Sequence, residues 1–365
     1  MKMKTCKKMI IPALALLTVA GGLLWAGLKY EPSRHFRNVE IPVLATPQPM
    51  KLPSVSGQGQ DKLAPSPASA SQAPSTKANR STVTVEGVEE NNYSSPGADS
   101  QAAQRSFNLL LLATDARAEE ASRTDVLILV HVNSDHNRIQ LISIPRDTRV
   151  HLPHVGWTKI NHAHALAESK GQSSHAGSKS AIQAVSDLCR CTINYYVKTN
   201  FEGFEHFVNT IGGVDMNLEA PVKLTYYHKT LPKGQQHWDG TTTLQFVRER
   251  KSLEDGDHAR QQNQVRVLKA IAKKILAPDN LRQLPTLLTL VKEDILDTNL
   301  TDADILSLGW LASQLDTEEI DYVQFPGRSG RAYDPLVQAE LYYWIPDMEA
   351  WEKLAPKALG ANSYE

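Results

Sequence analysis

The sequence predicts an α/β domain of α-β-α layers, in which helices cover both faces of a central mixed β-sheet, preceded by one transmembrane helix. Short continuous apolar runs of strand length predict the sheet. Segments whose apolar residues recur at helical spacing predict the helices between the strands. A long uncharged run near the N-terminus predicts the transmembrane helix. With 365 residues, the chain is long enough for one large domain or two ordinary ones.

The N-terminal region predicts a membrane anchor. Four lysines within residues 1–8 precede an uncharged apolar run over residues 9–28. As a helix, a run of this length spans roughly 30 Å, the thickness of one bilayer core. The lysines predict that residues 1–8 are cytoplasmic and that the C-terminal part lies outside, so the chain is expected to be a single-pass type II protein of the cell membrane. Signal cleavage near Ala20 is the less favoured alternative, because the apolar run is long for a signal peptide.

Residues 29–105 differ in composition from the rest of the chain. Prolines recur there among Ser, Ala, Gln and Gly, and no apolar periodicity is present. Such a segment buries too little surface to offset the entropy lost on ordering, so it is expected to be a disordered, extended stalk. The folded domain is expected to begin at Ser106 and to cover residues 106–355.

Five apolar runs predict the strands of the sheet. Residues 133–137 separate the second run from the third and are typical of a turn, so these two strands are expected to form a hairpin. A sixth, shorter run is expected to be a strand or the edge of another element. The five runs are residues 107–113, 126–132, 138–144, 193–197 and 320–325, and the shorter run is residues 244–247.

Helical spacing of apolar residues predicts the other elements. Gly212 and Gly213 end one helix as a C-cap would, and Thr301 with Asp304 resembles a capping box that begins another. Because strands and helices alternate in both local and crossover patterns, a mixed sheet is expected. The helices are expected at residues 178–189, 201–211, 260–276, 281–296 and from Thr301 through Leu311.

Overall composition excludes two classes of protein. The formal net charge of -1 argues against a nucleic-acid partner, so any anion binding must come from local clusters of cations. Three cysteines do not make a disulfide scaffold. A bridge between Cys189 and Cys191 would be strained, so two free thiols are expected there. Four histidines, at positions 151, 154, 162 and 164, could suggest a zinc site. This is the less favoured alternative, because no cysteine joins them.

Charged residues stand at the ends of the predicted strands. Asp115 follows the first strand, Arg123 and Asp125 begin the second, and Arg146 and Asp147 follow the third. Because open α/β folds bind ligands at strand ends, we expect a pocket there. Three more arginines and a glutamine follow the short run or lie in the long helix: Arg248, Arg250, Arg260 and Gln264.

This set of residue types suits a phosphate ligand with a metal ion. The planar fork of arginine bonds two phosphate oxygens at once. Carboxylates beside the arginines make sense if a divalent cation lies between them and the phosphates, because magnesium takes one or two carboxylates together with phosphate oxygens. For any one residue the alternative is a surface ion pair of little energetic value, and the number of such residues favours the binding site.

The order and spacing of seven segments resemble the LytR-CpsA-Psr family. The resemblance covers roughly residues 106–275, and the C-terminal segment LYYWIPDMEAW fits it as well. One departure is Asn263, where the family usually has a second basic residue, and Arg266 is a candidate to replace that contact. The seven segments are LLLLATDAR, SRTD, SIPRD, KINHAHA, FEGFEHFVNTIGGVD, WDGTTTLQFVRER and GDHARQQNQ.

The resemblance implies an LCP domain and a phosphotransferase of cell-wall assembly. Members of the family take a glycopolymer, such as teichoic acid or capsule, from an undecaprenyl-pyrophosphate carrier. They attach it to peptidoglycan through a phosphodiester at the C6 hydroxyl of N-acetylmuramic acid. The implied partners are therefore the lipid-linked glycopolymer, peptidoglycan and membrane lipid. The implied cofactor is Mg²⁺ or Mn²⁺.

The resemblance also assigns roles to residues. Asp115 and Asp125 would hold the metal, and with Arg123 they are the candidate catalytic residues; either carboxylate could take the proton of the acceptor hydroxyl. Lys159 and Asn161, in the KIN segment, would shape the pocket. Arg146, Arg248, Arg250, Arg260 and Gln264 would join Arg123 in binding the pyrophosphate.

An apolar tunnel should hold the polyprenyl chain. Phe204, Phe207 and Val208 are candidates for its wall, although ordinary core packing is the favoured alternative for them. Two other functions stay open from the sequence. A lipid-linked pyrophosphatase would use the same residues with water as the acceptor. A membrane-bound transcriptional attenuator is disfavoured, because residues 1–8 are too short for a cytoplasmic DNA-binding unit.

Overall fold

The computed structural model describes residues 31–48, 106–115, 122–169, 174–253, 256–275, 292–315 and 320–360, with a few isolated positions between 276 and 291. The chain divides into two units. The first comprises residues 1–48 and 104–365, and the second, residues 49–103, lies outside the described part.

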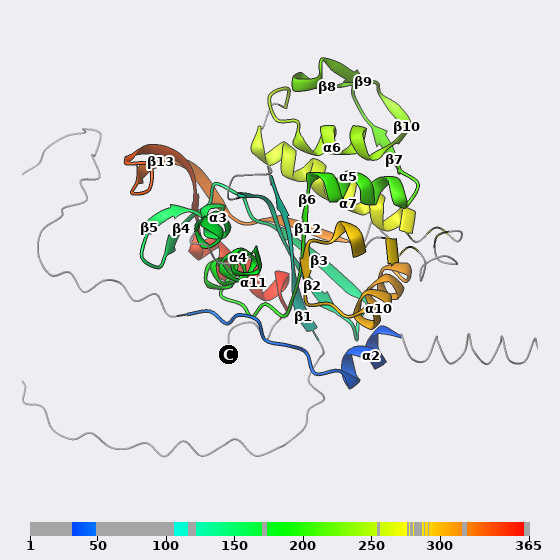
Figure 1. The fold of residues 1–365 in the computed structure, drawn as a ribbon, viewed down its shortest axis with the longest axis horizontal. Coiled ribbons are helices and arrows are strands. Elements are labelled where there is room, and N and C mark those ends of the chain that lie inside the picture. The colour runs from blue at the N-terminus through cyan, green and yellow to red at the C-terminus, as the bar shows by residue number, and fades with distance from the viewer. Residues whose placement is uncertain are drawn as a thin grey trace, which may run out of the picture. The chain divides into compact units, whose positions relative to one another are not determined.

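A six-stranded mixed sheet forms the centre of the domain, in the order β11-β6-β1-β2-β3-β12. The pairs β1–β2, β2–β3 and β11–β6 are antiparallel, whereas β1–β6 and β3–β12 are parallel. The predicted hairpin between the second and third strands is present, and the prediction of a mixed α/β fold is confirmed (Figure 1). The strands are β1 (Ser106–Thr114), β2 (Thr124–Asn133), β3 (Arg138–Ser143), β6 (Tyr195–Asn200), β11 (Asp297–Thr298) and β12 (Asp321–Gln324).

Helices cover both faces of this sheet (Figure 1). Because side chains alternate along a strand, Leu110 and Leu112 of β1 join the core on one face, while Phe107 and Leu109 join the core on the other. Each fully buried Leu or Phe contributes about 1.5–3 kcal/mol to stability. The first face packs on α3 (His162–Ser169), α4 (Ser174–Cys189) and α11 (Met348–Ala358), and the second on α2 (Pro32–Asn38), α7 (Asp257–Ile275) and α10 (Asp302–Ser313).

A third core lies beyond one end of the sheet, where two helices and two small sheets pack on α7 (Figure 1). Gly240 lies where these helices meet, and a Cβ there would collide with the carbonyl oxygen of Glu205. These elements are α5 (Phe201–Thr210), β7 (Val214–Leu218), β8 (Val222–Leu224), β9 (Lys229–Leu231), β10 (Gly234–Trp238) and α6 (Gly240–Arg248).

Two further hairpins complete the described part. Neither was predicted from the sequence, because the strands of the first are short and the first strand of the second carries few apolar residues. They are β4 (Arg149–Leu152) with β5 (Gly156–Lys159), and β13 (Gly327–Asp334) with β14 (Ala339–Pro346).

The N-terminal boundary of the domain differs from the prediction. Residues 31–48 were assigned to the stalk, but they pack on the domain: Phe36 is fully buried against Phe107 and Tyr195. Further along, Ala45 pairs with Ile193 through backbone hydrogen bonds. The sequence did not predict this docking, because one buried aromatic residue and backbone hydrogen bonds produce no apolar periodicity. The rest of the predicted stalk lies outside the described residues.

The short run at residues 244–247 is helical and not a strand. Asp239 accepts a hydrogen bond from the backbone N of Thr242 (2.8 Å) and caps α6, so the run forms the last turns of that helix. The capping box of Thr301 and Asp304 is present at the start of α10. Cys189 and Cys191 are buried free thiols, as expected.

The predicted membrane anchor, residues 9–28, lies outside the described residues. Among those that the structure describes, no helix is both long enough and apolar enough to cross a membrane.

Candidate active site

A cavity of about 620 Å³ lies between the sheet and the helices α5, α6 and α7. Its walls are mostly apolar, with contributions from Leu111 of β1, Ile128 of β2 and Val197 of β6 on the sheet side. On the helix side, Phe207 and Ile271 contribute from α5 and α7. Charged residues line the same cavity, so it combines an apolar interior with a polar part.

Six of the ten predicted site residues line this cavity. They come from four separate parts of the chain: the start of β2, the segment after β3, the end of α6 with the turn after it, and α7. Four are arginines, so the polar part of the cavity is strongly cationic. The six are Asp125, Arg146, Arg248, Arg250, Arg260 and Gln264.

An ion pair joins the first two of these residues. Arg146 Nη1 donates to Asp125 Oδ1 at 2.5 Å, and both side chains are about a fifth to a quarter exposed. Arg146 Nε also lies 3.9 Å from Asp147 Oδ2. Asp147 in turn accepts a hydrogen bond from Lys159 Nζ at 2.7 Å. These carboxylates hold the guanidinium in place at the cavity wall.

Lys159 and Asn161 do not line the cavity but support the segment that does. The backbone N of Asn161 donates to the carbonyl of Arg146 (3.3 Å), and Ile160 N donates to the carbonyl of Thr148 (2.8 Å). With the Lys159–Asp147 hydrogen bond, these contacts fasten the KIN segment to the segment that carries Arg146. Their position therefore agrees with the predicted role of shaping the pocket.

Glu249 fixes the positions of Arg248 and Arg250, which flank it. Its buried carboxylate accepts hydrogen bonds from the backbone N of Thr225 (2.5 Å), Arg250 (3.0 Å) and Ser252 (3.0 Å). Burial alone would raise the pKa of Glu249, but these donors outweigh it and lower the pKa below its usual value. Sequence reasoning missed this residue, since a glutamate between two arginines in RER resembles a surface ion pair.

Arg248 is oriented by two aromatic residues. Its guanidinium carbon lies 4.4 Å from the ring centroid of Phe201, and its Nη1 donates to the Tyr227 hydroxyl at 3.1 Å. Tyr226 and Tyr227 both line the cavity and are well exposed, at 62% and 37%. Sequence reasoning did not identify these two tyrosines as site residues. The adjacent aromatic pair in LTYYH was the feature that could have indicated them.

Arg260 and Gln264 lie one turn apart on α7 and are almost fully buried, at 7% and 8% exposed. The i, i+4 spacing directs both side chains to the same side of the helix. Arg266 was the candidate to replace a basic contact at position 263. It lies outside the cavity lining, and its Nη2 contacts the carbonyl of Asn217 (3.5 Å).

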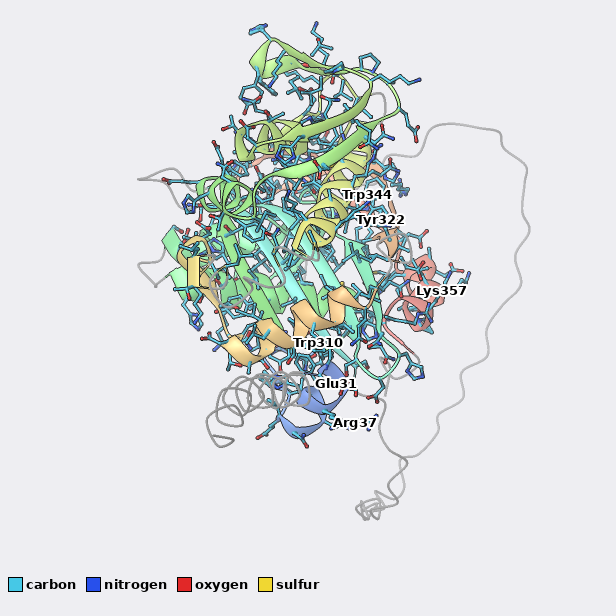
Figure 2. The ribbon with its side chains drawn as sticks, turned by 90° about the vertical axis from the view of Figure 1, so that its right-hand side faces the viewer. Glu31, Arg37, Trp310, Tyr322, Trp344 and Lys357 are labelled. Carbon is cyan, nitrogen blue, oxygen red and sulfur yellow. The ribbon has the colours of Figure 1, made fainter. Side chains whose placement is uncertain are left out.

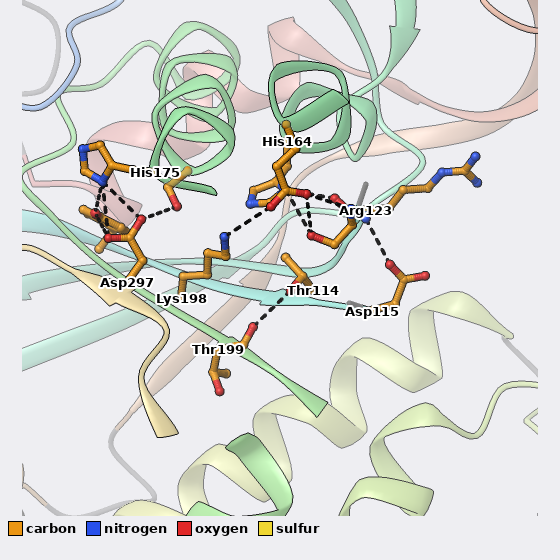
Figure 3. A network of polar contacts seen from close by, with 12 residues as sticks. Thr114, Asp115, Arg123, His164, His175, Lys198, Thr199 and Asp297 are labelled. Atoms are coloured by element: carbon orange, nitrogen blue, oxygen red, sulfur yellow. Dashed lines mark hydrogen bonds and ion pairs between the residues drawn. The ribbon is translucent and has the colours of Figure 1, made fainter. Parts of the chain in front are cut away.

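Asp115 and Arg123 lie at the adjoining ends of β1 and β2, outside the cavity lining. Two hydrogen bonds join them: Asp115 N donates to the carbonyl of Arg123 (3.1 Å), and Arg123 N donates to Asp115 Oδ1 (3.0 Å). The guanidinium of Arg123 extends away from Asp115 and is exposed (Figure 3). The structure thus places both residues beside Asp125 in the strand ends, but not in the wall of the cavity.

A buried polar network holds the residue that precedes Arg123 (Figure 3). Glu168 Oε2 accepts from the backbone N and the hydroxyl of Ser122, at 2.8 and 2.9 Å. Lys198 Nζ lies 3.9 Å from Glu168 Oε1. His164 Nδ1 lies 2.9 Å from the carbonyl oxygen of Ser122. Burial lowers the pKa of both Lys198 and His164. The network fixes the start of β2 from the opposite face of the sheet.

Two of the three predicted wall residues of α5 line the cavity. Phe204 and Phe207 face it, whereas Val208 is fully buried in the third core. The sequence favoured core packing for all three. Val208 differs from the two phenylalanines because it lies on the side of α5 that packs on α6 and β7.

The profile of the LytR_cpsA_psr family matches residues 68–358. The chain belongs to this family. It is 32% identical over 243 residues to the polyisoprenyl-teichoic acid–peptidoglycan teichoic acid transferase TagU of Bacillus mycoides. The matched region covers 66% of this chain and 74% of that relative. A TagU of Oceanobacillus iheyensis is 32% identical over 199 residues, 54% of this chain and 59% of that relative.

Solved structures agree with this membership. That of B. subtilis TagV matches with a TM-score of 0.59 and 25% identity, covering 70% of this chain and 98% of TagV. A structure of TagT bound to LI-WTA matches with a TM-score of 0.56 and 27% identity, covering 70% of this chain and 91% of that one.

The carboxylates of this LytR_cpsA_psr protein fit a magnesium ion that shares its coordination with a phosphate substrate. Asp125 lines the cavity, and Asp115 directly follows the adjacent strand β1. In the part of the chain that the structure describes, no cluster of three or more His, Cys, Asp or Glu is present. Magnesium bound together with substrate phosphates needs only one or two carboxylates, so this donor set is sufficient.

Proposed function

We propose that this protein transfers a glycopolymer from a polyisoprenyl-pyrophosphate carrier to peptidoglycan, forming a phosphodiester. The observation that carries the proposal is the single cavity that joins an apolar interior to four arginines and Asp125. A polyprenyl chain suits the interior, because its burial between apolar walls is favourable. The diphosphate suits the arginines, because guanidinium groups bond phosphate oxygens in pairs. Membership in the family and the names of the TagU relatives support the same reaction.

The reaction we propose uses undecaprenyl pyrophosphate as the carrier and the C6 hydroxyl of N-acetylmuramic acid as the acceptor. The hydroxyl oxygen bonds to the phosphorus next to the sugar, and the bond from that phosphorus to the bridging oxygen breaks. Undecaprenyl phosphate leaves with the bridging oxygen. The proton of the hydroxyl passes to a carboxylate at the strand ends, for which Asp125 is placed best because it lines the cavity.

Charge on the phosphate oxygens grows during this step, and the arginines stabilise it. Arg260 is almost fully buried, so its interaction with an anion is screened little by water. Arg146 and Arg248 are already oriented by Asp125 and Phe201 before substrate arrives. Asp115 and Asp125 would hold Mg²⁺, which supplies further positive charge to the diphosphate when bound. Arg123, at the strand end and exposed, would join these arginines in binding the diphosphate.

The test is transfer by the purified full-length chain in detergent, with lipid-linked glycopolymer and peptidoglycan. Covalent glycopolymer on the peptidoglycan and released undecaprenyl phosphate are expected. Sugar phosphate in solution with no product on the wall would show hydrolysis and overturn the transferase proposal. An Arg260→Ala variant is the negative control, and Arg266→Ala, whose guanidinium lies outside the cavity, is the matched control that should keep activity.

A further inference from the structure

The hairpin of β13 and β14 has two chemically different faces. One face packs on the domain: Tyr343 and Asp334 are fully buried, and the Tyr343 hydroxyl donates to Asp334 Oδ2 at 2.6 Å. Thr158 of β5 donates to the same carboxylate oxygen at 2.9 Å. Because side chains alternate along each strand, the opposite face, called here the outer hairpin face, carries a separate set. That set is Ser329, Arg331, Tyr333, Glu340, Tyr342 and Trp344.

Three aromatic rings alternate with hydrogen-bonding groups on the outer hairpin face. Tyr342 and Trp344 are two residues apart on β14, a spacing of about 6.8 Å along a strand. Tyr333 on β13 is 57% exposed. Between the rings, the hydroxyls of Ser329 and Tyr342 lie 3.2 Å apart. Flat apolar rings beside hydroxyl groups are the chemistry that binds pyranose rings, which present C–H groups on their faces and hydroxyls at their edges.

The ring of Trp344 is held in place before any ligand binds. Its Nε1 donates to the carbonyl of Phe325 at 3.1 Å. The indole also lies against Gly327, where a Cβ would collide with Nε1. A fixed ring loses little entropy on binding, which favours a preorganised binding surface.

The strand β14 pairs with the segment that carries Arg146. Trp344 N donates to the carbonyl of Asp147 at 3.0 Å, and Thr148 pairs with Trp344 in a parallel bridge. Asp147 is the neighbour of Arg146, which lines the cavity. A chain of sugars on this face would therefore run beside the segment that carries Arg146, one of the arginines proposed to hold the diphosphate.

We infer that the outer hairpin face binds the glycan strand of the acceptor peptidoglycan. This inference rests on the proposed transferase function and names the surface that presents the acceptor hydroxyl. Its charge decides between the two sugar polymers of that reaction. The face carries one cation, Arg331, and one anion, Glu340, so it is neutral. A phosphate-rich polymer would require excess cations, whereas the uncharged sugar backbone of a glycan strand requires none.

Binding of peptidoglycan glycan strands whose lactyl carboxyl groups are amidated, so that the sugar backbone is uncharged, to the full-length chain in detergent tests the inference. The double variant Tyr333→Ala/Tyr342→Ala should bind at least about tenfold more weakly, because truncation of aromatic contacts at a binding surface has effects of this size. Tyr333→Phe/Tyr342→Phe keeps both rings and should bind within about twofold of the unchanged protein. Trp310→Ala removes an exposed aromatic residue on α10, well separated from Trp344 in Figure 2, and should have no effect.

Unchanged glycan binding by the double alanine variant would overturn the inference, as would an equal loss in the Trp310→Ala control. A second measurement separates this result from the proposed transferase function. Binding of a short-chain prenyl pyrophosphate should be the same in all these variants, because the cavity is intact. Failure of that lipid to bind the unchanged protein would overturn the transferase proposal, whereas weaker lipid binding in the alanine variant alone would overturn the assignment of the face to the acceptor.

Discussion

Carboxylates set the positions of the arginines at the scale of single residues. Glu249 accepts several hydrogen bonds in the turn between Arg248 and Arg250, and Asp125 and Asp147 hold Arg146. Cations gathered in one cavity repel one another, so fixed anions beside them lower the cost of keeping the site assembled. The arrangement leaves the cavity cationic while its parts stay in place.

Replacing Glu249 by Gln should destabilise the protein by about 1–3 kcal/mol at pH 7, because a neutral amide accepts fewer of the hydrogen bonds offered by the buried backbone donors. The pKa of Glu249 is lower in the folded chain than its usual 4.5. Its ionised form therefore stabilises the fold above about pH 4.5, and this contribution is lost as the pH falls through the folded-state pKa. Urea denaturation at pH 7 and at pH 3.5 measures this contribution to the free energy of unfolding.

The difference in unfolding free energy between Glu249→Gln and the unchanged protein should be smaller at pH 3.5 than at pH 7. Glu219→Gln, an exposed glutamate, is the matched control and should differ from the unchanged protein by less than about 0.5 kcal/mol. An equal difference at both pH values would contradict the role of the ionised carboxylate.

Replacing Arg146 by Lys should lower the rate of transfer by roughly 10- to 100-fold, because the charge is kept but the two-oxygen fork is lost. Steady-state kinetics with lipid-linked glycopolymer measures this effect, and the loss should fall mainly on kcat. Arg266→Lys is the control, since that guanidinium contacts a backbone carbonyl outside the cavity. A rate for Arg146→Lys within twofold of the unchanged protein would exclude two-point recognition of phosphate by Arg146.

At the scale of elements, α5 forms part of the wall of the cavity. Replacing Phe207 by Trp adds volume where the side chain meets the cavity, so the fold should tolerate it while the space for a prenyl chain shrinks. We expect kcat/KM to fall by about tenfold for a long-chain donor and by less than twofold for a donor with a short prenyl chain. Glu202→Gln, an exposed change on the same helix, is the control. Equal losses for both chain lengths would exclude Phe207 from chain recognition.

Sequence patterns predicted the long elements well, because each has one strong periodic signal. The apolar strands β1, β2 and β3, and the helices α4, α5, α7 and α10, follow such patterns. The run in α6 was predicted only as a strand or the edge of another element, since its four apolar residues are too few to show a period and the start of the helix depends on the Asp239 cap. The hairpin β13–β14 was missed because one of its faces is polar and aromatic instead of apolar.

The candidate site was predicted in the same uneven way. Arginines and aspartates at strand ends were visible because they interrupt apolar runs, and six of ten line one cavity. Residues that position the site residues without lining the cavity could not be recognised from the sequence. Glu249, Lys198 and Glu168 resemble ordinary charged residues in the sequence, and only the burial of Glu249 and Lys198 and the hydrogen bonds of Glu168 show that they hold the site. Long-range partners of this kind depend on the tertiary structure.

At the scale of the whole molecule, the segment that follows the predicted anchor docks on the domain. The Nε2 of His35 lies 2.8 Å from Asp304 Oδ1, and both side chains are buried. The helix α2 begins at Pro32, and only residues 29–31 separate it from the end of the predicted anchor at residue 28. Three residues span at most about 11 Å. If residues 9–28 cross the membrane, the domain is therefore held close to the bilayer, with no long stalk between them.

Docking of α2 makes a prediction about stability. Phe36 is fully buried, so Phe36→Ala should lower the free energy of unfolding by about 3–5 kcal/mol. Val43→Ala, a change at a residue of the same segment that is 64% exposed, should alter it by less than about 0.5 kcal/mol. Thermal or urea denaturation of the full-length chain measures both. Equal stability of the Phe36→Ala and Val43→Ala variants would show that residues 31–48 are not part of the folded domain.

The same docking makes a prediction about distance from the membrane. Energy transfer between a dye on an exposed site of α10, such as Trp310→Cys, and acceptor dyes in the bilayer should be efficient in the reconstituted chain, because α2 packs beside α10. The background for labelling is Cys6→Ser, which leaves only the two buried thiols. Loss of α2 docking in Phe36→Ala should lower the transfer efficiency, because the domain could then move outward on the longer segment of residues 29–105. Efficiency that is low in both proteins would place the domain far from the bilayer and contradict the short connection inferred here, whereas a decrease confined to Phe36→Ala would show that docking of α2 holds the domain close to the bilayer.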